Sequence, residues 1–303
     1  MANPPPPTES VWSSCGKREL WRGHHIPTPP APETAQQPQT PQQAVPTLDE
    51  TPKSGESASI EDADANNQSL TGPESINAAA FRSAASELRE GETADGGGSE
   101  GAQDLLKWGR KSGRIVPDSD FENLPPLSNS TSEHEVFYQP ETGRVIKRTW
   151  PGFYGQVPTP EDGALGRRVA TPSEYLERQA LQNEVFGSDL RLEGVHASDR
   201  PSMIIGEPAG QPSFVVSQGF LESVHPDDLP PTTEQISDFM HEHGFREAPK
   251  SYFGWYRPAD ATVVVDAKPD NFVLTAEGVR PIDLQMAQFT PEEMQSAGLY
   301  TGE

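Results

Sequence analysis

The stretch from Val263 to Gln285 carries the side chains best suited to chemistry. Asp266, Lys268 and Asn271 follow a short β-branched run with the spacing D-x-K-P-x-N, and Asp283 lies in the third of three short apolar runs. A strand, a polar loop and a hairpin in this order bring the four side chains together around the opening of one site. Phosphoryl transfer needs such a set, in which two groups hold metal, one orients a hydroxyl and one neutralises phosphate charge.

Short extended segments position these side chains. We expect strands at Val263–Val265 and Phe272–Leu274, because apolar, β-branched runs of this length between turn residues are typical of strands. The second of these runs forms a hairpin with a third short run, which ends in Ile282-Asp283-Leu284. Ala276-Glu277-Gly278 supplies the turn between the second and third runs. An aromatic cluster just before the first run is read as core rather than as a ligand platform, and consists of Tyr252, Phe253, Trp255 and Tyr256.

A further candidate cation, Lys147, lies on a predicted hairpin. Glu135–Tyr138 and Arg144–Thr149 are the expected strands, and Pro140–Gly143 has the composition of a turn. A lysine on an edge strand is also an ordinary solvated charge. The hairpin alone therefore leaves a structural and a functional role for Lys147 equally open.

A helix with strong end signals follows. We expect it to begin after Thr171, because a proline and a glutamate stand where a helix start and a capping box need them, and to end near Phe186 before a glycine. Glu177 and Glu184 are seven residues apart and share one face. They are either surface acids, or one of them is the partner of Lys147.

Other elements are expected around this helix. Gln103–Lys111 has the spacing of a short amphipathic helix, a second capped helix begins at Thr232, and residues 152–163 are read as a loop because they are rich in Gly and Pro. His241 and His243 are two residues apart on the second capped helix and point to different faces, which argues against a metal site there. Three strands are expected at Leu190–Val195, Ser202–Glu207 and Phe214–Leu221.

The composition indicates one domain with a long tail. The chain has 303 residues with 32 Pro and 26 Gly, and only 33% of it is hydrophobic, so a large part cannot bury enough apolar surface to fold. We expect a disordered tail rich in Pro, Gln, Ser and Gly over residues 1–100, a domain over 101–295 and a C-terminal tail over 296–303. Within the first tail, Ser75–Arg89 has roughly helical spacing, but a helix there is marginal alone.

The net charge narrows the classes of partner. A charge of −23 disfavours nucleic acid and anionic membranes, because both require a basic face. The single cysteine, Cys15, excludes an internal disulfide or a cysteine-rich zinc cluster. Without a signal-peptide pattern or a membrane-spanning apolar run, we expect a cytoplasmic location.

Taken together, these segments resemble the protein-kinase-like superfamily. Its catalytic loop reads H-R-D-x-K-P-x-N and is followed about a dozen residues later by a metal-binding Asp. More narrowly, the segment from about Asp104 to Gln285 is similar to the serine/threonine/tyrosine kinase-like domain of bacterial polyvalent proteins. The matching residues are Ser132–Tyr138, Arg144–Lys147, Thr171–Val195, the run DAKPDNFVL and the run PIDLQ. The resemblance implies a compact α+β, two-lobed kinase-like fold with a reduced C-terminal lobe.

The resemblance also implies roles for the central residues. Asp266 would accept or orient the proton of the acceptor hydroxyl, and Lys268 would balance charge on the moving phosphoryl group. Asn271 and Asp283 would hold Mg²⁺, a hard cation that suits amide and carboxylate oxygens. The acceptor would be a hydroxyl group of a protein or a small molecule.

The nucleotide-binding part is implied in the same way. Lys147 would contact the α- and β-phosphates of ATP, steadied by Glu177 or Glu184, of which we favour Glu177 in the middle of the helix. Ser128–Ser132 would replace a glycine-rich phosphate loop. Phe220–Ser223 would meet the adenine through main-chain groups.

The chain departs from the family pattern at several points. Val264 and Val265 stand where His-Arg is usual, Leu284-Gln285 replaces Phe-Gly, and no G-x-G-x-x-G precedes Lys147. Only twenty residues follow Asp283, which leaves no room for the helical lobe that usually presents peptide substrates.

These departures leave three functions to weigh. The favoured one is a minimal ATP- and Mg²⁺-dependent kinase. The second is a catalytically weak nucleotide-binding pseudokinase or scaffold. The third is a small-molecule phosphotransferase of the aminoglycoside or choline kinase type, which Lys268-Pro269 disfavours.

Overall fold

The computed structural model describes residues 73–90, 99–128, 133–202 and 208–299. In these ranges the chain forms a mixed α+β fold with five α-helices and antiparallel sheets, which confirms the predicted fold class at that level. Most of the predicted N-terminal tail lies outside the described residues. No helix in the described part is long and apolar enough to cross a bilayer.

A five-stranded sheet carries the lysine hairpin. The hairpin prediction is confirmed, and β3 lies between β2 and β7, so Lys147 is on a central strand rather than an edge. Of the strand expected at Ser202–Glu207, residues 203–207 lie outside the described part. In sheet order the strands are β1 (Pro126–Ser128), β2 (His134–Gln139), β3 (Arg144–Thr149), β7 (Pro212–Gly219) and β6 (Arg191–Ala197).

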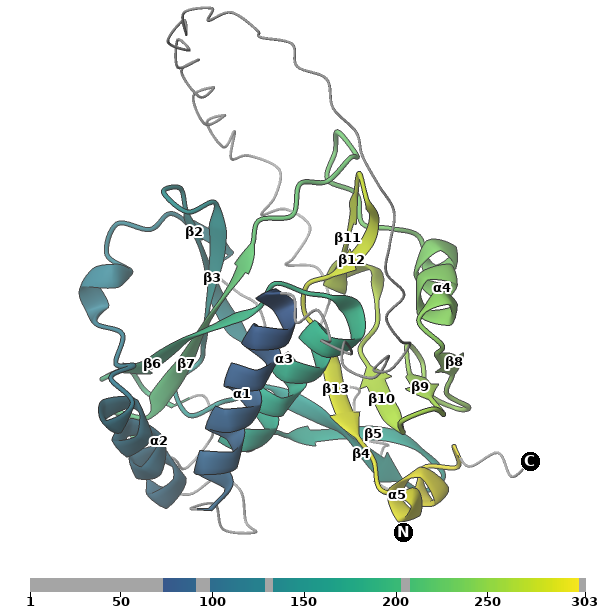
Figure 1. The fold of residues 1–303 in the computed structure, drawn as a ribbon, viewed down its shortest axis with the longest axis horizontal. Coiled ribbons are helices and arrows are strands. Elements are labelled where there is room, and N and C mark those ends of the chain that lie inside the picture. The colour runs from purple at the N-terminus through teal and green to yellow at the C-terminus, as the bar shows by residue number, and fades with distance from the viewer. Residues whose placement is uncertain (1–72, 91–98, 129–132, 203–207, 300–303) are drawn as a thin grey trace, which may run out of the picture. The chain divides into compact units, whose positions relative to one another are not determined.

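Helix α3 (Pro172–Phe186) lies at the centre of the fold, between the five-stranded sheet and β13 and β10 (Figure 1). Its predicted capping is confirmed: the Thr171 side chain accepts a hydrogen bond from the Glu174 N–H, and the Glu174 side chain accepts one from the Thr171 N–H. Gly187 ends the helix at φ 61°, a left-handed conformation that glycine adopts without steric cost.

The boundary of the N-terminal tail at residue 100 is wrong. Helix α1 (Pro73–Arg89) runs beside α3 (Figure 1), and Phe81 and Leu88 are 0% and 4% exposed in the core that α3 shares. Burying an aromatic or leucine side chain contributes roughly 1.5–3 kcal/mol, which compensates for the weakness of the isolated helix. Helix α2 (Ser99–Lys111) also begins before its predicted start.

A hairpin replaces the loop expected over residues 152–163. Strands β4 (Gln156–Glu161) and β5 (Ala164–Val169) pair across a two-residue turn. Pro158 and Pro160 lie within β4, although proline cannot donate to a ladder. They are accommodated because they face Arg167 and Leu165 at positions that alternate with the hydrogen-bonded pairs.

The C-terminal elements form a second sheet, a hairpin and two helices. The predicted hairpin after the D-x-K-P-x-N loop is confirmed, because β11 pairs with β12. The end of the third predicted run, Ile282–Leu284, is not a strand but the connection between β12 and β13. Helix α5 (Pro291–Ser296) leads to Ala297 and Leu299, which are 0% and 2% exposed, so the C-terminal tail does not begin at residue 296. The remaining elements are α4 (Thr233–Glu242), β8 (Arg246–Glu247), β9 (Trp255–Arg257), β10 (Thr262–Val265), β11 (Phe272–Thr275), β12 (Gly278–Pro281) and β13 (Gln285–Gln288).

Candidate functional site

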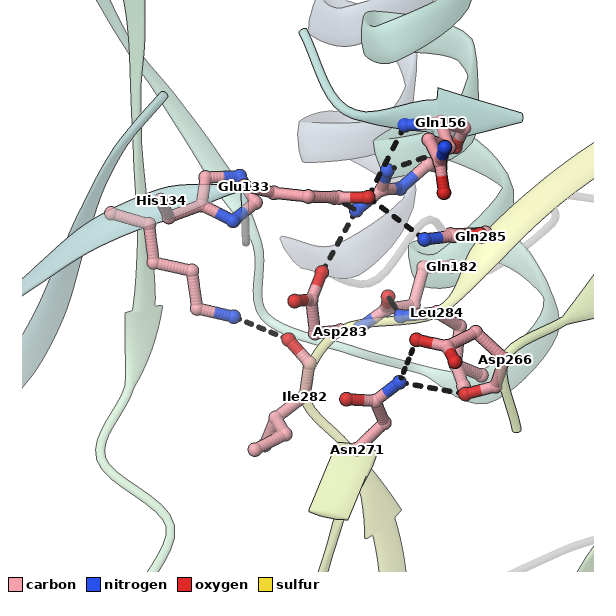
Figure 2. Close-up of polar contacts among 12 residues, drawn as sticks. Glu133, His134, Gln156, Gln182, Asp266, Asn271, Ile282, Asp283, Leu284 and Gln285 are labelled. Carbon is pink, nitrogen blue, oxygen red and sulfur yellow. Dashed lines mark hydrogen bonds and ion pairs between the residues drawn. The ribbon is translucent and has the colours of Figure 1, made fainter. Parts of the chain in front are cut away.

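The D-x-K-P-x-N loop closes on the side chain of Asp266. Asp266 follows the last residue of β10 and adopts φ 59°, which turns the chain sharply. The Asn271 amide donates to the main-chain oxygen of Asp266 at 2.6 Å and to its Oδ2 at 2.9 Å (Figure 2). Lys268 Nζ donates to both carboxylate oxygens at 2.9 and 3.0 Å. The three predicted residues of this loop therefore form one cluster.

Asp283 lies near this cluster because of strand pairing. β10 and β13 are antiparallel neighbours, and Val265 faces Gln285 in their register. Asp266 leaves β10 at the same end at which Asp283 enters β13. The main-chain N–H of Ile282 also donates to the main-chain oxygen of Asn271 at 2.9 Å.

Lys147 reaches this region from the five-stranded sheet. Its Nζ donates to the main-chain oxygen of Ile282, the residue before Asp283, and to Gln218 Oε1 at 3.1 Å. Gln218 also donates to the Pro281 oxygen at 3.4 Å. The structure thus brings the lysine of β3 to the segment that carries Asp283.

The helix acids do not take part in this cluster. Glu184 binds Arg82 of α1 through two hydrogen bonds of 2.8 and 2.6 Å, and Glu177 pairs with Arg89 of the same helix. The prediction that Glu177 steadies Lys147 is therefore wrong. The prediction fails because Arg82 and Arg89 of α1 attract the acidic face that Glu177 and Glu184 share on α3.

The residue of α3 that faces the site is Arg178, which the sequence analysis missed. It is 1% exposed, and its Nη2 donates to Glu133 Oε2 at 2.7 Å and to Asp283 Oδ1 at 2.8 Å. Its Nη1 donates to the main-chain oxygen of Gln156 at 3.1 Å. Arg178 is three residues after Tyr175 on the buried face, so helical spacing was the one signal for its position.

Glu133 completes the buried network. Its Oε1 accepts hydrogen bonds from Gln285 Nε2 at 2.8 Å and from the Gln156 N–H at 3.2 Å (Figure 2). Burial raises the pKa of Glu133 because desolvation outweighs the attraction of Arg178, and the charge of Asp283 adds to the rise. The pKa of Arg178 is also raised, since the two carboxylates outweigh its burial. The guanidinium of Arg178 therefore forms ion pairs with both the Glu133 and the Asp283 carboxylates.

Three side chains of this region have the chemistry of metal ligands. One ligand atom each from Glu133, His134 and Asp283 lie within 4.8 Å of one another. Arg178 already bridges the two carboxylates, and His134 Nε2 lies 3.1 Å from the Tyr175 hydroxyl. A cation at this cluster would have to displace the guanidinium, so the closeness of the two acids is better explained by their ion pairs with Arg178.

Comparisons of the chain with protein-family models, with curated proteins and with solved structures found no match.

Proposed function

We propose that the domain is a minimal kinase-like phosphotransferase that uses ATP and Mg²⁺ to phosphorylate a hydroxyl group. The proposal includes a two-lobed arrangement, with the five-stranded sheet and α3 in one lobe and a reduced second lobe around β10, β13 and α4. The observation that carries it is the hydrogen bond from Lys147 Nζ to the main chain of Ile282, the residue before Asp283. This contact lies next to the loop that Asn271 closes on Asp266.

The described residues fit the parts of such a site. Lys147 supplies a cation for the phosphates, and Asp266, held by Lys268 and Asn271, is oriented to receive a proton. Asp283 and the Asn271 amide oxygen offer the hard oxygen ligands that suit Mg²⁺. When bound, Mg²⁺ neutralises charge on the phosphates of the nucleotide.

The proposed transfer balances without a further reactant. The acceptor hydroxyl gives its proton to Asp266 and its oxygen forms a bond to the γ-phosphorus. The bond from this phosphorus to the bridging oxygen breaks, and ADP leaves with the electron pair. Asp266 afterwards releases the proton to solvent.

A second function is favoured by Arg178. Asp283 is bound to a buried guanidinium that also holds Glu133, so one metal ligand of the proposed site is engaged in an ion pair. A domain that keeps this pair would bind a nucleotide with little or no transfer, as a pseudokinase does.

Two measurements test both functions. Thermal unfolding is followed with ATP in the presence and absence of MgCl₂, and transfer is followed from ATP labelled at the γ-phosphate to serine, threonine and tyrosine peptides and to water. We expect Mg²⁺-dependent stabilisation of the parent that Asp283→Asn loses. Asp266→Asn should keep the stabilisation and lose transfer.

The matched control is Asp238→Asn, which removes an exposed acid of α4 and should behave like the parent. Stabilisation without transfer would favour the second function. A parent that no nucleotide stabilises would contradict both.

A further inference from the structure

Strand β5 has an open main-chain edge beside Asp266. In the β4–β5 register, Leu165 and Arg167 face Pro160 and Pro158, which have no N–H to donate. In an antiparallel ladder such pairs are the non-hydrogen-bonded ones, so the main-chain groups of Leu165 and Arg167 point away from β4. They form the outer edge of the hairpin.

Only part of this edge is covered in the described structure. The Leu165 N–H donates to Ser251 Oγ at 2.9 Å, and the Ser251 hydroxyl donates back to the Leu165 oxygen at 3.4 Å. Among the described residues, none hydrogen-bonds to the main chain of Arg167, and residues 167–169 are exposed. An unpaired strand edge is a template for an added strand.

The edge leads directly to the proposed acceptor site. Arg167 Nη1 lies 3.6 Å from Asp266 Oδ1, beyond hydrogen-bonding distance, and its side chain is 49% exposed. Its neighbour Arg168 differs, because it forms a bidentate pair with Glu174 on the other face of the strand. Arg167 therefore retains donors for a further acid close to the carboxylate that would receive the acceptor proton.

A strained loop borders the same place. The Phe253 oxygen accepts a hydrogen bond from the Ala267 N–H at 3.1 Å, which joins the loop before β9 to the Asp266 loop. Phe253 and Lys250 both have φ 60°, and Asp266 has φ 59°. Left-handed conformations of residues other than glycine are strained and concentrate at functional sites. Tyr252 lies between Lys250 and Phe253 in the sequence. Its side chain is 89% exposed and its ring packs against the ring of Phe253.

A second cation stands at the other end of the edge. A Cβ atom on Gly163, in the β4–β5 turn, would lie 3.9 Å from Lys250 Nζ. Lys250 at the turn and Arg167 near Asp266 thus flank the Ser251 contact along β5. Two exposed cations along one edge attract acidic groups at short range, and they do so against the net charge of −23.

From these contacts we propose that the acceptor is a serine or threonine within an acidic, extended peptide that adds as a strand to the edge of β5. The peptide pairs with the main chain of Arg167 and with the N–H of Val169, whose oxygen accepts a hydrogen bond from Arg168 Nη1 at 3.3 Å. It places its acids at Arg167 and Lys250 and presents its hydroxyl to Asp266. This inference rests on the proposed function and names its substrate class.

The test measures peptide binding without nucleotide, by fluorescence anisotropy on the full chain. The probes are a labelled peptide with a central serine, β-branched neighbours and acidic ends, and the same peptide with lysine at the acidic positions. We expect the acidic peptide to bind at least about tenfold more tightly than the lysine peptide. Arg167→Glu should remove this preference, whereas Arg110→Glu, which makes the same charge change on the exposed face of α2, should retain it.

A second pair of variants tests the main-chain edge. Val169→Pro removes the outward N–H of β5 and keeps the Arg167 side chain, so binding should weaken several-fold, whereas Val169→Thr keeps the N–H and the affinity. Unchanged melting temperatures show that each variant is folded. Equal affinity for the two peptides, or equal effects of Arg167→Glu and Arg110→Glu, would overturn the inference.

Transfer to a small alcohol but to no peptide would also overturn this inference, while leaving the proposed phosphotransferase intact. Loss of nucleotide binding in the parent would instead contradict the proposed function itself.

Discussion

The Glu133–Arg178–Asp283 network and the Asp266 loop lie at neighbouring strand ends, yet they are stabilised in different ways. The network joins residues from three distant segments through Arg178, which is 1% exposed. The loop forms its hydrogen bonds within a few residues, and its Lys268 side chain is 29% exposed. The network therefore fixes the elements relative to one another, whereas the loop is held in shape by its own local hydrogen bonds.

Removing the central cation of each region should have unequal effects on stability. Arg178→Met leaves the buried Glu133 and the half-buried Asp283 without their shared donor, and we expect the free energy of unfolding to fall by about 3–5 kcal/mol. Lys268→Met removes a partly exposed partner of Asp266 and should cost about 1 kcal/mol or less. Urea denaturation measures both. Equal losses would show that the two regions are not stabilised differently.

The packing around the network offers a second comparison. A Cβ atom on Gly155 would lie 2.6 Å from Glu133 Oε2 and 2.8 Å from Arg178 Nη1, and φ is 76°. Gly143, in the β2–β3 turn, has φ 63°, and a Cβ atom on it would have no neighbouring atom within 4 Å. Gly143→Ala should cost about 1–2 kcal/mol from the left-handed conformation alone.

Gly155→Ala should cost about 2–4 kcal/mol, because it adds displacement of the ion pair to the same backbone strain. Thermal unfolding of the two variants separates these contributions. If both substitutions lower the melting temperature equally, the network is not tightly packed against Gly155.

The smallest expected effect on stability concerns the ion pair between Arg168 and Glu174, in the first turn of α3. Burial opposes the change, but hydrogen bonds from Arg168 and from the Thr171 N–H lower the pKa of Glu174 below the ordinary value of a glutamate. A carboxyl with a lowered folded-state pKa stabilises the fold above its unfolded-state pKa. That contribution is lost as the pH falls through the folded-state pKa.

Glu174→Gln should therefore cost less than about 1 kcal/mol at pH 7, and the difference from the parent should vanish in acid. Chemical denaturation across this pH range measures it. A difference that stays constant into acid would assign the stabilisation to packing rather than to charge.

Local signals explain what the sequence predicted correctly. The capping box at Thr171, the lysine hairpin and the D-x-K-P-x-N loop depend on residues a few positions apart. The proximity of Asp266 and Asp283 was also predicted, because two strand ends and one hairpin determine it.

Long-range contacts explain what the sequence analysis missed. Arg178 finds Glu133 45 residues before it and Asp283 105 residues after it, and no local pattern records such a triple contact. The acids of α3 were misassigned because α1 was predicted to belong to a tail. The β4–β5 hairpin was read as a loop because Pro158 and Pro160 usually argue against strands, and only the register shows where they are tolerated.

The central claim is that Asp283 and the nearby loop hold a divalent cation together with a nucleotide that Lys147 contacts. Electron paramagnetic resonance of Mn²⁺, titrated with the chain and a non-hydrolysable ATP analogue, tests it most directly. We predict that the parent and Asp238→Asn bind Mn²⁺ only in the presence of the analogue, and that Asp283→Asn and Lys147→Met do not. Mn²⁺ that remains free with the parent and the analogue would contradict the claim.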